Sequence, residues 1–292
     1  MRDLAVGWSF ALPFTLLFVV FLLGPVLASL AMSFTDIRSS DVRDPLAVTP
    51  IGFDNYIRLF SDEQFLKAAG NTILVVLLGL PLTIALGLAA ALGLNSGLVR
   101  FRGLFRVGYY LPVVTSIVAI SVVWRFLLQP ESGLLNSVLG LVGIDGPNWL
   151  ANTSTALPAV IAMIVWRGLG FQMVIFLAGL QAIPQELYEA ARIDGASRWA
   201  QFRHVTVPAL RPTLLFCTVI GSIGLLQVFE EPFVMTRGGP LDSTLTVAYS
   251  MYSQFSFGNY GYASAMSYVL FVAIVLLSIV WFRLLRGADE TP

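Results

Sequence analysis

The sequence predicts an all-α, polytopic membrane protein with six transmembrane helices. Of its 292 residues, 57% are hydrophobic and 12% are charged, which is about half of the charged fraction usual in soluble domains. The mean hydropathy is +0.81. Six stretches contain no Asp, Glu, Lys or Arg: Leu4 to Thr35, Ala68 to Val99, Val107 to Trp124, Asn148 to Trp166, Pro212 to Phe229 and Ser243 to Phe282. A bilayer core of ~30 Å needs about 20 apolar residues in a helix, so we expect several spans and little soluble structure.

The apolar runs, bounded by turn residues and charges, define the expected spans. They lie near residues 8–34, 71–95, 105–128, 157–183, 213–236 and 263–285. The first run is much longer than the apolar core of a signal peptide, about 7 to 15 residues, and Asp3 stands beside Arg2. We therefore interpret it as a span rather than as a cleaved signal. No internal repeat or linker is visible, and we expect residues 1–292 to form a single transmembrane domain.

The basic residues predict the orientation of the spans. The tails, the connections 96–104 and 184–212 and the span ends beside them contain Arg2, Arg100, Arg102, Arg106, Arg192, Arg198, Arg203, Arg211, Arg283 and Arg286. The longer connections 35–70, 129–156 and 237–262 contain only Arg38, Arg43, Arg58, Lys67 and Arg237. Because cytoplasmic loops carry the excess of Lys and Arg, the arginine-rich side is predicted to be cytoplasmic. An even number of spans then places both termini in the cytoplasm.

The composition also excludes several functions. One histidine, His204, and one cysteine, Cys217, leave no Cys/His metal site and no disulfide. Lys67 is the only lysine and no Walker-type GxxxxGK[ST] motif contains it, so ATP would have to bind to another subunit. The formal net charge of zero gives no reason to expect a nucleic-acid partner.

The connection 184–212 is predicted to fold as two short helices. Pro184 suits a first helical position, Glu186 and Glu189 lie near the positive end of the helix dipole, and Gly195 is placed to end the helix in a left-handed conformation. Ser197 is a suitable cap for a second helix, which Pro208 is expected to stop. A solvated connector is the simplest interpretation, but a folded helical hairpin with a small surface at Ala190 and Ala191 favours a docking surface.

This connection resembles the EAA loop of the permease subunits of binding-protein-dependent ABC importers, in the carbohydrate-uptake class of the maltose and glycerol-3-phosphate permeases. The resemblance begins with Glu189-Ala190-Ala191, the glycine four residues later and the closing Val207-Pro208. Further similar motifs are Gly52-Phe-Asp-Asn-Tyr, Ala69-Gly-Asn-Thr, Tyr110-Leu-Pro112, Trp124-Arg-Phe, Gly133-Leu-Leu-Asn136, Ala178-Gly-Leu-Gln-Ala-Ile-Pro184, Thr236-Arg-Gly-Gly-Pro240 and Gly261-Tyr-Ala-Ser-Ala265. Two features differ: Arg237 occupies a position that is usually small, and the outer loop after the third span is short.

The resemblance implies half of a translocation channel in the inner or plasma membrane of a bacterium or archaeon. Its partners would be a second permease subunit in a heterodimer, two ATPase subunits that bind ATP and Mg²⁺, and an extracytoplasmic substrate-binding protein. This chain would bind no cofactor of its own and would not be an enzyme. The residues implied to couple it to the ATPases are Glu189, Ala190, Ala191, Asp194, Gly195 and Pro208.

Polar residues inside the predicted spans suggest a substrate pathway. Ionisable groups at membrane depth cost at least ~2.5 kcal/mol, so Arg167, Glu230 and Glu231 are expected to face protein or water. The candidate pathway residues are Trp166, Arg167, Gln172, Gln227, Phe229 and Glu230. Gln227 and Glu230 are expected to share one helix face. The alternatives are an internal ion pair, Arg167 with Glu230, made for folding, or contacts to the second permease.

We therefore expect a sugar importer permease, with a di- or oligosaccharide as the favoured substrate. A glycerol-3-phosphate or glycerophosphodiester importer is the alternative within the resembling class. A stand-alone secondary carrier would show inverted repeats, which the sequence lacks, and a membrane enzyme would need a cluster of His, Cys or paired acids.

Overall fold

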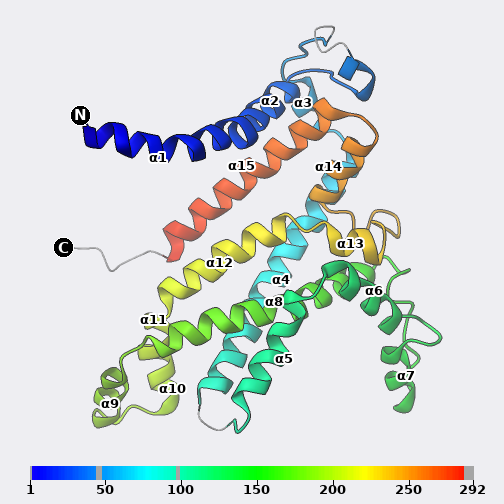
Figure 1. Ribbon diagram of the computed structural model, residues 1–292. Helices are drawn as coiled ribbons and strands as arrows, with labels where there is room; N and C mark the ends of the chain where they lie inside the picture. Colours follow the sequence, from blue (N-terminus) through cyan, green and yellow to red (C-terminus); the bar gives the residue numbers. More distant parts are fainter. Residues whose placement is uncertain (1, 44–47, 97–98, 286–292) are drawn as a thin grey trace. The chain divides into compact units, whose positions relative to one another are not determined.

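The computed structural model describes residues 2–43, 48–96 and 99–285 (Figure 1). Regular structure in these ranges is helical, apart from one isolated antiparallel bridge between Thr35 and Pro50. Five helices are long and apolar enough to cross a membrane, and a bent pair brings the number to six. The predicted all-α membrane fold is thus confirmed. The chain divides into two compact units, residues 1–66 with 250–272 and residues 67–249 with 273–292.

The first unit contains the N-terminal span and the first half of the last one. Helix α1 (Arg2–Phe18) continues through a π-helical turn (Val19–Leu23) into α2 (Gly24–Ser33). A 3₁₀ turn (Ser39–Arg43) and α3 (Asp54–Leu59) follow. The amide of Asn55 donates to the carbonyl oxygens of Ser33 and Thr35, each at 2.9 Å. The Arg58 guanidinium lies 4.4 Å from the centre of the Tyr262 ring. Side-chain contacts therefore fix the short segments that follow the first span.

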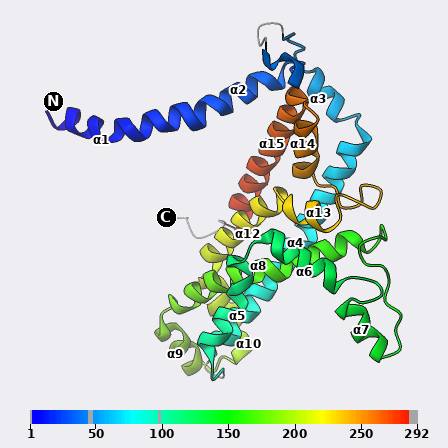
Figure 2. The same cartoon turned by 45° about the vertical axis from the view of Figure 1, so that its right-hand side comes forward.

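The second unit is organised around one buried helix, α8 (Ala156–Gln181). More than half of its most apolar window, 56%, is buried, whereas none of the window in Phe10–Ser33 is. It packs against α5 (Arg102–Val114) and α12 (Arg211–Leu226), as both views show (Figures 1 and 2). Helix α4 (Glu63–Asn95) joins them in a core cluster of Ala91, Leu94, Met173, Phe176, Leu177, Leu180, Leu210 and Cys217.

The remaining helices are α6 (Ile117–Leu127), α7 (Leu134–Leu141), α9 (Gln185–Ile193), α10 (Arg198–Gln201), α11 (Val207–Ala209), α13 (Glu230–Met235), α14 (Val247–Ser256) and α15 (Tyr260–Leu285). Many large apolar side chains on the long helices point outward, among them Phe10, Leu77 and Phe271, exposed by 82%, 62% and 58%. In water such surfaces would aggregate, whereas in a membrane they contact lipid.

Glycines set the close approach of helices in the second unit. A Cβ on Gly170 of α8 would collide with the backbone carbonyl oxygen of Tyr109 on α5. A Cβ on Gly87 of α4 would lie 2.6 Å from Cβ of Gln172 on α8. Small residues at these crossings let the backbones approach as membrane helices often do.

Two predicted spans are not continuous helices. The span expected at 105–128 is the pair α5 and α6, bent by 101°. Pro112 removes one helical hydrogen bond, and Thr115 and Ser116 then take extended ψ angles of 148° and 127°. The span expected at 213–236 breaks between α12 and α13, where Phe229 has φ −136°. The expectation that Gln227 and Glu230 share one helix face was therefore wrong.

The predicted helix ends in the connection 184–212 also need two corrections. Pro184 is the N-cap of α9 rather than its first helical residue. Pro208 does not stop the second helix, because a π-helical turn (Phe202–Thr206) leads into α11, which includes it. A proline clashes with the carbonyl group four residues before it in a regular α-helix, and here the π-helical turn occupies the residues just before Pro208.

Candidate functional site

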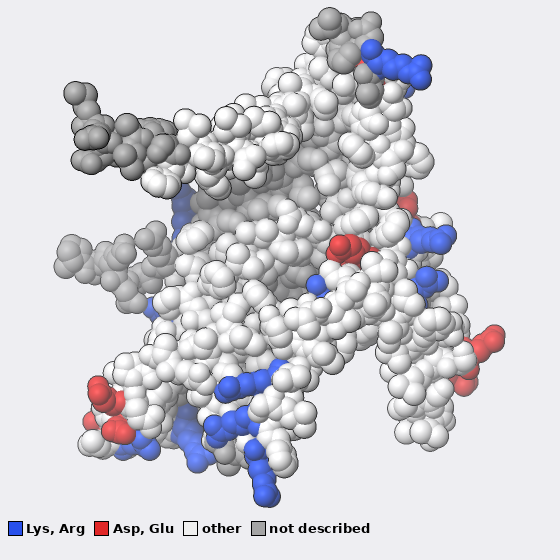
Figure 3. Space-filling view, viewed as in Figure 1, with Lys and Arg blue, Asp and Glu red and all other residues white. Residues whose placement is uncertain are grey.

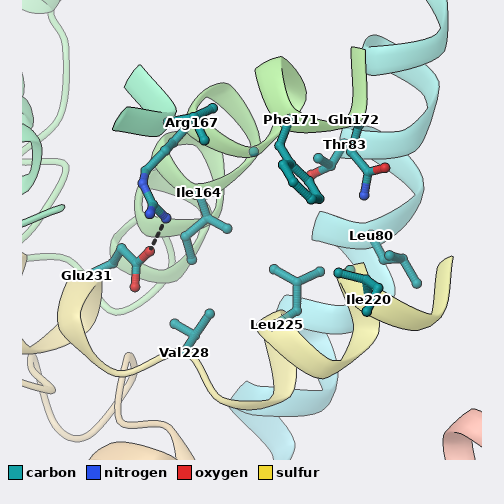
Figure 4. A pocket seen from close by; sticks show the side chains of 14 residues that line it. Leu80, Thr83, Ile164, Arg167, Phe171, Gln172, Ile220, Leu225, Val228 and Glu231 are labelled. Atoms are coloured by element: carbon teal, nitrogen blue, oxygen red, sulfur yellow. Dashed lines mark ion pairs between the residues drawn. The ribbon is translucent and has the colours of Figure 1, made fainter. Parts of the chain in front are cut away.

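A cavity of about 250 Å³ lies inside the second unit, between α4, α8 and α12 (Figure 4). Most of its wall is apolar. Its lining residues are Leu80, Thr83, Val113, Ile164, Arg167, Gly168, Phe171, Gln172, Ile220, Gly221, Gly224, Leu225, Val228 and Glu231. Because a few polar groups converge on an otherwise apolar cavity within spanning helices, this is the candidate binding site of the chain.

An ion pair closes one side of the cavity. Nη1 of Arg167 on α8 lies 3.6 Å from Oε1 of Glu231 on α13, with side chains exposed by 26% and 6% (Figure 4). The sequence-based alternative paired Arg167 with Glu230, and this is corrected: the partner is the next residue. The pair leaves the cavity without net charge. Nε of Arg167 is buried and has no hydrogen-bond partner among the described residues.

Gln172 supplies the second polar group. Its side chain is 3% exposed, and its Nε2 donates to the backbone carbonyl of Cys217 on α12 at 3.3 Å. Its Oε1 is buried without a hydrogen-bond partner in the described part of the chain. An unpaired buried carbonyl costs about 1–3 kcal/mol. Gln172 is therefore a residue of the cavity wall whose acceptor is not satisfied within the described part of the chain.

Two further lining residues complete the site and carried no signal in the sequence. The hydroxyl of Thr83 donates to the carbonyl of Gly79 at 2.7 Å, which leaves its lone pairs free to accept. The ring of Phe171 is 38% exposed beside the cavity (Figure 4). Both residues lie in long apolar runs, where a threonine or a phenylalanine is ordinary, and only the packing of α4 against α8 brings them together.

Four of the six candidate pathway residues do not line this cavity. Trp166 is 42% exposed and its ring centre lies 5.8 Å from that of Trp124. Gln227 and Glu230 are exposed. Phe229 packs with aromatic residues, its ring 5.2 Å from Phe233 and 5.7 Å from Tyr249. The structure thus brings together Arg167 and Gln172, and it separates them from Trp166, Gln227, Phe229 and Glu230.

A second candidate surface is the hairpin that follows α8. Helix α9 ends as predicted at Gly195, whose φ is +77°. The N–H of Ala196 donates to the carbonyl of Ala191 at 2.8 Å, and that of Gly195 to Arg192 at 3.1 Å. These two bonds form a Schellman motif. The predicted cap also exists, since Oγ of Ser197 accepts the N–H of Ala200 at 3.2 Å.

The hairpin exposes both charge and apolar area. Glu189, Ala190, Asp194, Gly195 and Pro208 are exposed and Ala191 is half-buried. Beside them Leu187, Ile193 and Trp199 are exposed by 48%, 87% and 68%. Acidic side chains gather over α9, and basic ones below α5 and α10 (Figure 3). Apolar side chains this exposed, with charges around them, are typical of surfaces that contact other proteins, which makes the hairpin a candidate docking surface.

The hairpin is held together from within. The hydroxyl groups of Tyr188 on α9 and Thr206 in the π turn lie 3.0 Å apart. Nε2 of Gln201 donates to the carbonyl of Ala196 at 2.9 Å, and the rings of Trp199 and Phe202 stack at 5.4 Å. These contacts give the hairpin a defined fold of its own.

Comparison with known proteins identifies the family. The profile described as "Binding-protein-dependent transport system inner membrane component" matches residues 83–289. The lactose transport system permease protein of Rhizobium radiobacter is 36% identical, over 96% of this chain and 94% of its own length. The arabinooligosaccharides transport system permease protein of Bacillus subtilis is 34% identical, over 96% and 88%. The trehalose/maltose transport system permease protein of Thermococcus litoralis is 32% identical, over 98% and 95%.

Solved structures agree. A chain of a bacterial ABC transporter involved in the import of the acidic polysaccharide alginate superposes with a TM-score of 0.81 at 26% identity, covering 99% of this chain and 97% of that one. The same values of TM-score and identity hold for the alginate transporter in complex with an alginate pentasaccharide-bound periplasmic protein. The resemblance indicated by the sequence motifs is confirmed, and the chain belongs to the family of binding-protein-dependent transport system inner membrane components, as a sugar-type ABC importer permease.

Proposed function

We propose that this chain forms half of the translocation pathway of an ATP-driven importer for a di- or oligosaccharide. The names of its relatives, which transport lactose, arabinooligosaccharides and trehalose or maltose, support this substrate class. The single observation that carries the proposal is the cavity, which Gln172 and Arg167 line between spanning helices, each with one buried polar atom that has no hydrogen-bond partner in the described part of the chain.

The cavity suits part of a sugar pathway. Gln172 accepts a hydroxyl hydrogen, Arg167 donates to a hydroxyl oxygen, and the ring of Phe171 offers an apolar face to the C–H side of a pyranose. Its volume of about 250 Å³ is below the ~300–1,000 Å³ of complete ligand pockets. A second permease subunit would supply the other wall. The uncompensated donor and acceptor favour an uncharged, hydroxylated solute over an anion, because the Arg167–Glu231 pair leaves no net charge.

The hairpin α9–α11 would couple this chain to the ATPases. In this proposal Glu189, Ala190, Ala191, Asp194 and Gly195 form the docking helix, and Pro208 closes the hairpin at its return to the membrane. Two ATPase subunits would bind ATP and Mg²⁺, and their closure would move the spans through this helix. Both termini and the hairpin lie in the cytoplasm, and a substrate-binding protein docks on the opposite side.

Copurification and transport test the proposal together. Mild extraction of the tagged chain should retain an ATPase with Walker motifs and a second permease subunit, and a loaded substrate-binding protein should stimulate ATP hydrolysis. A chain that copurifies with no ATPase and accumulates solute from an ion gradient alone would contradict it.

A further inference from the structure

A second pocket, which shares no lining residue with the cavity above, lies at the C-terminal ends of α6 and α13. It measures about 620 Å³ and is lined by the ends of these helices and by the segments 128–130 and 148–151. Its polar wall contains Arg125, Gln129, Asn148, Thr236 and Arg237. Two guanidinium groups in one pocket, and no carboxylate in its wall, make it a site for an anionic group.

Arg237 is held in an unusual backbone conformation. Its φ of +53° is rare for a residue with a side chain and costs about 1–2 kcal/mol relative to glycine. The surrounding turn enforces it: the N–H of Gly238 donates to the carbonyl of Pro232 at 3.4 Å, and the hydroxyl of Thr236 donates to the same oxygen at 2.9 Å. Strain retained at a position that glycine would fill without strain points to a use for the arginine side chain.

The two arginines are free to bind. Arg237 is exposed and forms no ion pair or hydrogen bond among the described residues. Nη1 of Arg125 donates to the carbonyl of Val234 on α13 at 3.4 Å, and this guanidinium also lacks an acidic partner there. The contact with α13 positions Arg125 while most of its five donors stay available. Guanidinium groups bind carboxylates through paired hydrogen bonds.

We infer that Arg125 and Arg237 form a docking site for an acidic side chain of the extracytoplasmic substrate-binding protein. The inference rests on the proposed function, which places this end of α6 and α13 outside the cytoplasm. A carboxylate on the transported solute is the other source of the same group. The inner cavity argues against it, because Arg167 is already neutralised there by Glu231, so that an anionic solute would pass from a doubly basic pocket to one with a carboxylate.

Equilibrium binding to the complete transporter in nanodiscs tests this inference. The probe is the transporter's own substrate-binding protein, loaded with its sugar, titrated at 50 and 200 mM NaCl. Arg125→Glu and Arg237→Glu should each raise the Kd about tenfold at low salt and should weaken its salt dependence, as expected for a charge pair at an interface. Arg237→Lys keeps the charge but loses the paired donors of the guanidinium, so it should raise the Kd less than Arg237→Glu does.

Two controls separate charge from folding. Arg237→Gly removes the charge and relieves the backbone, so it should assemble normally yet bind the probe more weakly. Arg43→Glu makes the same change in net charge as the two pocket variants, but at an exposed position outside the pocket. It should leave the Kd unchanged.

Unchanged Kd values for both glutamate variants in assembled complexes would overturn the inference. If the same variants leave the Kd unchanged but need a higher solute concentration for half-maximal uptake, the inference is also overturned, because the bound carboxylate would then belong to the solute. If the wild-type complex itself fails to bind the substrate-binding protein, the proposed function fails instead.

Discussion

Nη1 of Arg167 and Oε1 of Glu231 lie 3.6 Å apart across the cavity, joining α8 to the short helix α13. Both groups lie in segments long and apolar enough to span a membrane, where an isolated charge is costly. The pair explains how the chain tolerates them, and it fixes α13 after the break in the fifth span. One interaction thus shapes the cavity wall and stabilises a discontinuous helix.

Glu231→Ala should therefore reduce the amount of assembled complex, because it leaves the partly buried Arg167 without its counter-charge. We expect a loss of about 3 kcal/mol, the lower end of the range for breaking a buried pair. The double variant Arg167→Ala/Glu231→Ala should recover part of this loss. Yield and thermal stability of the complex measure both effects.

Glu230→Ala is the matched control, since this neighbouring carboxylate is exposed. It should assemble as well as wild type. A Glu231→Ala complex with wild-type yield and thermal stability would show that the ion pair has no structural role.

Gly195→Ala should impair coupling rather than folding. The φ of +77° at this position costs a residue with Cβ about 1–2 kcal/mol, although no atom lies within 4 Å of the added carbon. The Schellman motif that ends α9 would loosen, and ATP hydrolysis stimulated by the substrate-binding protein should fall. Gly195→Asn should be milder, because asparagine tolerates the left-handed region.

The control for this variant is Gly103→Ala, a helical glycine of α5 with open space around it. It should behave as wild type. Full stimulation in Gly195→Ala would show that the end of α9 does not transmit the ATPase movement.

Gly170→Ala should disrupt the packing of α5 on α8. The added Cβ would collide with the backbone carbonyl oxygen of Tyr109, which cannot move aside as a side chain does. We expect a sharp fall in the amount of folded protein recovered from membranes, while Gly103→Ala is recovered normally. Equal recovery of both variants would mean that the two helices do not cross this closely.

Single cysteines test the proposed orientation. In a Cys217→Ser background, cysteines at Ser96 and Arg198 should react with a membrane-impermeant maleimide only from the cytoplasmic side, and a cysteine at Asp62 only from outside. Ser96 and Arg198 are exposed and Asp62 is half-buried. Labelling of Arg198→Cys from outside would invert the orientation and move the hairpin away from the ATPases.

The sequence predicted the features that depend on local rules. Apolar run length located the spans, and α8 begins and ends within two residues of the expected 157–183. Gly195 and Ser197 end and begin their helices as glycine and serine usually do. Such helix ends can be predicted because a single residue determines them, through its allowed backbone angles or its capping hydrogen bond.

The features that could not be predicted from the sequence depend on tertiary packing. The bend between α5 and α6 lies in an apolar run that reads as one helix, since Pro112 alone is compatible with a continuous span. Glu230 and Glu231 are adjacent and chemically identical, and only the break before α13 decides which one meets Arg167. Thr83 and Phe171 become site residues because α4 and α8 cross beside them.

Uptake by proteoliposomes that contain the complete transporter, its substrate-binding protein and ATP tests the central claim most directly. Wild-type complexes should accumulate a labelled di- or oligosaccharide only when ATP and the binding protein are both present. At unchanged complex yield, Gln172→Leu should raise about tenfold the concentration of loaded binding protein that gives half-maximal uptake, or slow uptake at saturation about tenfold. A tenfold effect corresponds to ~1.4 kcal/mol, the value of one lost hydrogen bond. Gln181→Leu, an exposed glutamine at the end of the same helix, should transport normally. Uptake without ATP, or unaltered uptake by Gln172→Leu, would contradict the account.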